Sequence, residues 1–405
     1  MAETAERIQA RRHGGEFVTV GRLVAALLAV IPLVATMARL AADAKAPFTS
    51  MLHYFLPYLH ITYFDFGFVR RGLYGTAAHA IGAPVTIETV AALFVAGVIA
   101  FTIVSVRLIE RSGSGLSPEN RLWLIILFLA SPATLLHFAV DAGRADIFVA
   151  LLFLLAANAI AHHRPIAATG AFCASMLIHE AAYVLFAPVF VGLLMETTRG
   201  SSVSAIRRAG AYAVVPTVLF AAIYLFGGLD EASVTTIGQL VESEDPSVIS
   251  DPMYPFATSL GTNAAWIGCI YAHNPLYWAS LILPLIALGF LAVLFVGVDN
   301  WPRLAVSVGV LLGAAIMGGV AFDQSRYFAL AMIGVWSYAL ALRRFNWINP
   351  MSPTTKAGFA LMLLAGPLTI FSGFAVVAKI LGAVSGETGA FVFGGAVACA
   401  ANFVN

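Results

Sequence analysis

Residues 165–195 read PIAATGAFCASMLIHEAAYVLFAPVFVGLLM, an apolar stretch interrupted near its middle by the pair His179-Glu180. A membrane-spanning helix needs about 20 apolar residues, so this stretch is too long for one simple span. A glutamate in the middle of an apolar helix is also costly unless its charge is satisfied. We therefore predict two short helices that meet at His179-Glu180, and this turn decides how the rest of the chain crosses the membrane.

The distribution of basic residues favours the two-helix arrangement. With it, the chain has about twelve membrane segments, and most of its 22 basic residues fall on the side that holds both termini. Basic residues concentrate in cytoplasmic loops, so the N-terminus and the C-terminus are predicted to be cytoplasmic. A single helix would place the loop 228–275, which is acidic and has no lysine or arginine, inside. It would also place Arg207 and Arg208 outside, against the same rule.

The composition is that of a membrane protein. Hydrophobic residues make up 60% of the chain and charged residues 11%, whereas soluble domains carry about 25% charged residues. The net charge of +1 gives no general attraction to nucleic acid. We predict an all-α fold, a polytopic transmembrane helical bundle that forms one integral membrane domain over residues 1–405. The predicted spans are 19–41, 89–108, 122–140, 146–161, the two halves of 165–195, 208–227, 276–298, 304–322, 328–342, 357–381 and 389–404.

Two long loops, 42–88 and 228–275, are predicted on the outer side. The segment 48–63 is rich in aromatic residues and leucine, which favours a helix lying in the outer interface. Each half of the 165–195 hairpin would be about 22 Å long as a helix, which is shorter than the ~30 Å hydrocarbon layer. Its apex is therefore expected below the outer surface, in a cavity open to the outside. The isolated cysteines Cys173, Cys269 and Cys399 are interpreted as small apolar residues.

Ionisable residues gather in four connections that are predicted to reach this outer face. Such residues are rare at membrane depth and usually mark function. The first outer loop contributes Asp65, Arg70 and Arg71, the second Asp141, Arg144 and Asp146, the hairpin apex His179 and Glu180, and a later turn Asp323, Arg326 and Tyr327. The sequence thus predicts one polar site built from distant parts of the chain.

These residue types suit a phosphorylated substrate. Arginine offers forked, permanently charged donors that match phosphate oxygens, and a carboxylate can act as a general base or hold a divalent cation. Structural roles are alternatives for each group. Asp65 can pair with Arg70 or Arg71 to fold its loop, Asp146 can favour the start of a helix, and Asp323 can pair with Arg326.

The order of these motifs resembles that of EpsG-like polysaccharide polymerases and, more broadly, the GT-C fold of integral-membrane glycosyltransferases. The matched positions are Asp141 and Arg144 in a D-x-x-R motif, then His179, then Arg326-Tyr327-Phe328. A long first outer loop with an acidic residue, here Asp65, also fits the GT-C plan.

The resemblance implies an extracytoplasmic glycosyltransferase or glycan polymerase of a bacterial inner membrane. Its donor would be a polyprenyl-phosphate or polyprenyl-diphosphate sugar, and its acceptor a glycan or lipid. Asp65 would be the base, with Asp146, Glu180 and His179 as further catalytic candidates. Some GT-C enzymes use Mg²⁺ or Mn²⁺, but nothing in this sequence specifies a metal or other cofactor. The substrate-binding residues would be Arg70, Arg71, Asp141, Arg144, Asp323, Arg326 and Tyr327.

Two other functions fit parts of the pattern. A secondary transporter or a flippase for lipid-linked glycans would place polar residues on broken helices near the bilayer midplane. A membrane acyltransferase would use a buried histidine with an acid, a role open to His179 with Glu180.

Overall fold

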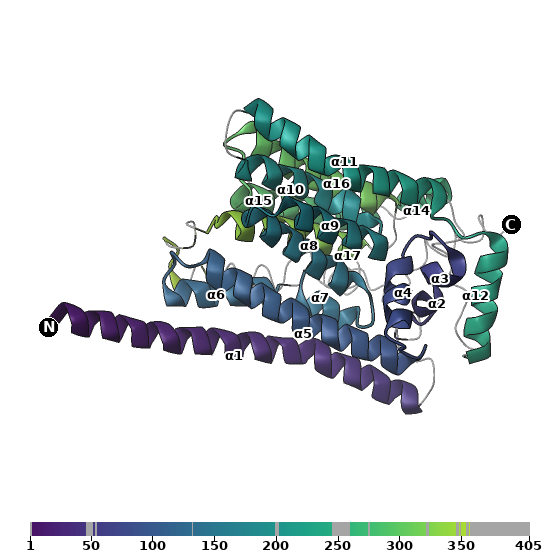
Figure 1. The fold of residues 1–405 in the computed structure, drawn as a ribbon, viewed down its shortest axis with the longest axis horizontal. Coiled ribbons are helices and arrows are strands. Elements are labelled where there is room, and N and C mark those ends of the chain that lie inside the picture. Colours follow the sequence, from purple (N-terminus) through teal and green to yellow (C-terminus); the bar gives the residue numbers. More distant parts are fainter. Residues whose placement is uncertain are drawn as a thin grey trace.

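The computed structural model describes the chain as a bundle of helices (Figure 1). The residues described are 2–45, 52, 55–131, 133–198, 202–244, 260–273, 276–320, 324–345, 348, 350–353 and 356. Within these ranges there is no strand, which confirms the predicted all-α class. The predicted spans 357–381 and 389–404, and the site candidate Asp323, lie outside the described residues.

The helices follow one another in a simple order. The first long one is α1, Ala2–Lys45, and the first loop holds three short ones: α2, Pro57–His60; α3, Tyr63–Phe66; and α4, Gly72–Ala80. The rest are α5 Ile87–Ser112, α6 Pro118–Leu129, α7 Leu135–Val140, α8 Asp146–Ala161, α9 Pro165–Ile178, α10 Ala181–Thr197, α11 Ser202–Phe226, α12 Glu231–Glu244, α14 Leu260–His273, α15 Leu276–Phe295, α16 Trp301–Val320 and α17 Gln324–Leu342.

Among the described residues, four helical stretches are long and apolar enough to cross a membrane. They are Thr19–Ala42, Ile87–Ser112, Val203–Phe226 and Trp301–Val320. Five shorter apolar helices, including α8, α9 and α10, pack among them. The chain is therefore a helical membrane protein, and the total of about twelve segments stays a prediction.

The predicted turn at His179-Glu180 is confirmed. Helix α9 ends at Ile178 because His179 has an extended backbone, with φ −156° and ψ 118°, and α10 begins at Ala181. Glu180, at the start of α10, pairs with Arg71, whereas Glu196 in its last turn pairs with Arg303. Helix α10 therefore runs from one end of the bundle to the other.

The neighbours of α10 fix the direction of the other helices. Gly334 of α17 lies against Phe186 and Val189 of α10, and Arg326 near the start of α17 pairs with Asp146 at the start of α8. Helices α8, α10 and α17 thus start at a common end, which we call the network end. We call the opposite end, where these three helices finish, the basic end. Figure 1 shows the short helices α2, α3 and α4 beside α12 at the right of the bundle.

Aromatic side chains hold α8, α9 and α10 together below the network end. The rings of Phe153 and Phe186 stack with centroids 4.0 Å apart, and Phe172 meets Phe153 edge to face at 5.6 Å. All three side chains are fully buried. The polar side chains at the ends of these helices are therefore carried by a rigid apolar core.

Three sequence-based expectations differ from the structure. The predicted span 122–140 consists of α6 and α7, separated by a break in which the Thr134 hydroxyl donates to the carbonyl of Leu129 at 3.0 Å. The described part of 48–63 contains the four-residue helix α2 and Tyr63, the first residue of α3, and Leu56 and Leu59 are buried inside the protein. Cys269 forms a disulfide, so its interpretation as an isolated apolar residue was wrong.

Helices α10 and α16 pack closely through glycines of α16. A Cβ atom at Gly313 would overlap the backbone carbonyl oxygen of Val184, and one at Gly309 would lie 2.7 Å from the Cβ of Pro188. Small residues permit such close backbone approach in membrane helix pairs. A Cβ atom at Gly319, on the same helix, would meet no atom within 4 Å.

Gly313→Ala is therefore expected to lower the free energy of unfolding by about 1–3 kcal/mol, the usual cost of overpacking. Gly319→Ala is the matched control and is expected to be neutral or slightly stabilising, because alanine favours a helix over glycine. Thermal unfolding of both purified variants in the same detergent measures the difference. Equal melting temperatures for the two variants would contradict the close packing.

Candidate functional site

The first ion pair at the network end joins α8 to α17. Asp146, the first residue of α8, accepts hydrogen bonds from Arg326 Nε and, at 2.6 Å, from Arg326 Nη2. The Asp146 side chain is 2% exposed and that of Arg326 13%. A buried carboxylate needs such a forked partner, and the start of a helix favours its negative charge.

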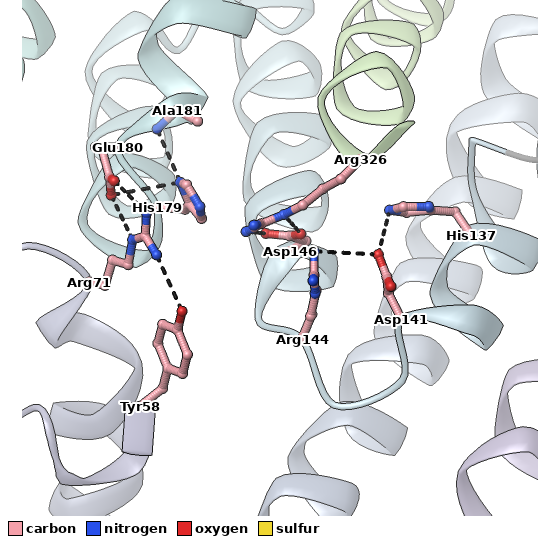
Figure 2. A network of polar contacts seen from close by, with 10 residues as sticks. All are labelled: Tyr58, Arg71, His137, Asp141, Arg144, Asp146, His179, Glu180, Ala181 and Arg326. Atoms are coloured by element: carbon pink, nitrogen blue, oxygen red, sulfur yellow. Dashed lines mark hydrogen bonds and ion pairs between the residues drawn. The ribbon is translucent and has the colours of Figure 1, made fainter. Parts of the chain in front are cut away.

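The second ion pair joins the first loop to the hairpin apex (Figure 2). Arg71 Nε donates to Glu180 Oε2 at 3.0 Å, and Arg71 Nη2 donates to Glu180 Oε1 at 2.6 Å. Arg71 Nη1 donates to the hydroxyl of Tyr58 at 3.3 Å. Arg71 precedes α4 with a left-handed backbone, φ 62°, a conformation that costs energy for a residue other than glycine.

The electrostatic environment of the two loop arginines differs. Burial by itself lowers the pKa of Arg71, but the Glu180 carboxylate and then Tyr58 raise it above its ordinary value. Burial lowers the pKa of the half-buried Arg70; Glu180 opposes this shift, and the positive charge of Arg71 adds to it. The negative charge at the hairpin apex therefore stabilises both guanidinium ions.

A third polar group forms around the loop between α7 and α8. Asp141 Oδ2 lies 3.4 Å from His137 Nε2 and 3.6 Å from Arg144 Nη1. The guanidinium of Arg144 also lies over the ring of Phe55, 5.4 Å from its centroid. The Asp141 side chain is 19% exposed, and its contacts to His137 and Arg144 are longer than the arginine contacts of Asp146 and Glu180. It is therefore the least tightly held carboxylate of the network.

His179 lies between the first two pairs. Its Nδ1 accepts the backbone N–H of Ala181 at 3.1 Å and lies 3.7 Å from the Glu180 carboxylate, and its ring meets Tyr327 edge to face. A neutral imidazole that accepts at Nδ1 carries its proton on Nε2. The side chain is buried, and within the described residues this Nε2 has no hydrogen-bond partner.

The structure thus brings together most of the residues that the sequence singled out. We call Arg71, Asp141, Arg144, Asp146, His179, Glu180 and Arg326, with Tyr58 and His137, the polar network. Tyr327 contacts it through His179, and Arg70 adjoins it through the charge of Glu180.

Asp65 lies outside the polar network. It is exposed in the short helix α3, where its Oδ2 accepts from the Thr62 hydroxyl at 2.5 Å and its backbone N–H donates to the same hydroxyl at 3.1 Å. This reciprocal pair of bonds is a helix cap. Among the described residues, Asp65 forms no ion pair with Arg70 or Arg71, which was the alternative role considered for it.

Sequence reasoning missed two members of the network, Tyr58 and His137. His137 stands in an apolar run four residues before Asp141, so the argument that identified His179 applies to it as well. Tyr58 is one of many aromatic residues in its segment, and no sequence signal separates it from them. In the parts of the chain that the structure describes, no three His, Cys, Asp or Glu side chains are grouped to hold a metal ion.

The arrangement can bind an oxygen-rich ligand and move a proton. It offers the buried guanidinium of Arg144, a buried imidazole N–H and, in Asp141, a carboxylate with long contacts at one end of a membrane bundle. No family model, curated protein or solved structure matches the chain, so the site itself carries the argument about function.

Proposed function

We propose that the protein is a glycosyltransferase or glycan polymerase of the GT-C type, acting at the outer face of a bacterial inner membrane. Its donor is a sugar linked to a polyprenyl phosphate or diphosphate, and its acceptor is a hydroxyl of a glycan or lipid. The chain has about twelve membrane segments, with both termini in the cytoplasm. The polar network binds the phosphate of the donor.

The buried N–H of His179 is the observation that supports this proposal most directly. Buried donors are nearly always satisfied, and this one lies between the Arg71–Glu180 and Arg326–Asp146 pairs. An oxygen of a phosphate or of a sugar would satisfy it. The network also lies at the ends of apolar helices, where a lipid-linked substrate would place its polar part.

The contacts of the carboxylates favour Asp141 as the base that takes the proton from the acceptor hydroxyl. Asp146 and Glu180 each use both oxygens to accept from an arginine, which lowers their tendency to accept a proton. Among the described residues, the Asp141 carboxylate has charged contacts only with His137 and Arg144, and both are longer. The exposed Asp65, favoured by the resemblance, is the competing base.

The disulfide at Cys269 supports an outer location for the network end. Disulfides persist in oxidising compartments such as the bacterial periplasm, and Cys269 lies in the predicted outer loop 228–275. The Tyr271 hydroxyl in the same helix α14 donates to the carbonyl of Gly318, near the end of α16. Helix α16 starts at the basic end, where Arg303 pairs with Glu196, so α14 lies toward the network end.

Binding of a short isoprenoid diphosphate tests the proposal. Farnesyl diphosphate is expected to stabilise the purified protein saturably in thermal unfolding, whereas farnesol, which lacks the diphosphate, is not. Arg144→Lys is expected to weaken this binding about tenfold, because lysine cannot reproduce the guanidinium fork. Arg164→Lys, at an exposed arginine before α9, is the matched control and should bind as the parent protein does.

Ligand binding by the purified protein and glycan formation in cells together distinguish the two candidate bases, Asp141 and Asp65. Asp141→Asn is expected to retain farnesyl diphosphate binding but to abolish glycan formation in cells, whereas Asp65→Asn should retain both. Loss of glycan in Asp65→Asn with normal output from Asp141→Asn would transfer the role to Asp65. Equal effects of farnesol and farnesyl diphosphate would contradict a phosphate site.

Transport is the second candidate function, and one observation favours it. Two short helices that meet at a charged pair, as α9 and α10 do at His179-Glu180, resemble the broken helices of transporters. Reconstituted vesicles separate the two functions. Counterflow of a lipid-linked sugar without a new glycosidic bond would establish transport and exclude our proposal.

A further inference from the structure

A second polar cavity lies at the basic end, between the ends of α5, α8 and α17. Its volume is about 180 Å³. Arg111 of α5, His162 after α8 and Arg343 after α17 are exposed and line it, together with Asn158, while buried Leu154 and Leu340 contribute apolar surface. Among the described residues that line this cavity there is no aspartate or glutamate.

Four other cations at the basic end are matched by carboxylates, whereas Arg121 and Arg164 form no ion pair among the described residues. Arg22 pairs with Glu110, Arg303 with Glu196 and Asp299, Arg344 with Asp299, and Lys356 with Glu119. By contrast, Arg111, His162 and Arg343 form no ion pair within the described part of the chain. A cation interacts favourably with a helix C-terminus, which accounts for the position of each of these three residues taken alone. It does not explain why all three line one cavity.

Three of the remaining polar side chains that line the cavity, Ser112, Ser337 and His162, are already engaged within the protein. The Ser112 hydroxyl donates to the carbonyl of Leu340 at 2.5 Å, and that of Ser337 donates to Ile333 at 2.7 Å. His162 Nδ1 lies 2.8 Å from the carbonyl oxygen of Asn158. The guanidiniums of Arg111 and Arg343, the side chain of Asn158 and the second nitrogen of His162 are the groups left to meet a ligand. The guanidiniums suit an anion, and the imidazole does so when both of its nitrogens carry hydrogen, because Nδ1 already donates to the Asn158 carbonyl.

We propose that this cavity binds a phosphate group, carried by a lipid head group or by a small soluble phosphate ester. Arginine forks recognise phosphate oxygens, and basic pockets between membrane helices bind anionic head groups. The volume suits a phosphate with a few attached atoms and is below the ~300–1,000 Å³ of sites for larger ligands. A phosphate held by all three cations would tie α5, α8 and α17 together at the ends opposite the polar network.

Binding of dioleoylphosphatidic acid to the full-length protein in a neutral detergent tests this site. Dioleoylglycerol, which has the same chains but lacks the phosphate, is the control ligand. The test variant combines Arg111→Gln with Arg343→Asn, because asparagine tolerates the positive φ of 54° at position 343. Arg164→Gln is the control variant, since Arg164 is exposed between α8 and α9 but does not line the cavity.

We expect phosphatidic acid to bind saturably and dioleoylglycerol not to bind. Each arginine replacement should weaken binding roughly fivefold, and Arg164→Gln should leave it unchanged. Displacement by millimolar glycerol 3-phosphate would assign the site to soluble esters, whereas failure of glycerol 3-phosphate to displace the lipid would assign it to lipid head groups. Both results support a phosphate site.

Two results would overturn the proposal. One is binding as tight in the double variant as in the parent protein, and the other is an equal loss in Arg164→Gln, which would indicate general surface attraction. If the double variant does not fold, Arg111→Gln alone replaces it and is expected to weaken phosphatidic acid binding about fivefold. Unchanged binding in that folded variant would also overturn the proposal.

Discussion

Arg326→Gln is expected to lower the free energy of unfolding by about 3–5 kcal/mol, because it leaves a buried carboxylate without its ionic partner. The carboxylate is that of Asp146, whose side chain is 2% exposed and accepts both of its arginine hydrogen bonds from Arg326. Arg22→Gln is the matched control. Arg22 makes the same forked contact with Glu110, but its side chain is 63% exposed, so its loss should have little effect on stability.

A double-mutant cycle tests whether the loss of stability in Arg326→Gln comes from its interaction with Asp146. Asp146→Asn with Arg326→Gln is expected to be more stable than the sum of the single variants indicates, by an amount on the order of 1–3 kcal/mol. Unfolding in mixed detergent micelles measures all four proteins. If Arg326→Gln costs no more than Arg22→Gln, the pair is not the buried contact between α8 and α17 that the structure shows.

His179→Asn is expected to reduce glycan formation by about 10²–10³-fold, the usual effect of removing one hydrogen-bond donor from a catalytic site. The asparagine oxygen can replace Nδ1 as the acceptor for the Ala181 N–H, but no group replaces the buried Nε2–H. Stability should therefore change by less than about 1 kcal/mol. Glycan output in cells and the melting temperature of the purified protein are the two measurements.

His179→Gln provides the complementary variant. Its amide N–H reaches the region of Nε2, whereas the acceptor for Ala181 is lost. It is expected to retain more activity than His179→Asn and to be less stable by about 1 kcal/mol. The opposite order of activities would assign His179 a purely structural role at the helix junction and would remove the main support for the proposed function.

The sequence contains enough information to predict the hairpin and the side of the bundle to which its apex points. The distribution of basic and acidic residues among the loops predicted that His179 and Glu180 lie at the same end of the bundle as Asp146 and Arg326. In the structure these four residues do lie at one end (Figure 2). These predictions succeeded because each depends on an apolar helix, whose length and direction can be read from residue types.

The contacts of the first loop could not be predicted in the same way. Arg71 meets Glu180, 109 residues later in the chain, whereas Asp65 is exposed and its carboxylate accepts from Thr62, the residue that caps α3. Helices α2 and α3 have four residues each, too few to show a hydrophobic period. Tertiary packing of buried residues such as Leu59 and Ile61 therefore decides which polar side chain of the loop faces the bundle.

The two ion pairs of α10 have a mechanical consequence. Arg71 holds Glu180 at the start of the helix through both carboxylate oxygens, and Arg303 holds Glu196 in its last turn in the same way. A piston movement of one helical turn, about 5.4 Å, would break both forks at once. Helix α10 is thus anchored at both ends, and the fork at Glu180 also ties the start of α4 in the first loop to the bundle.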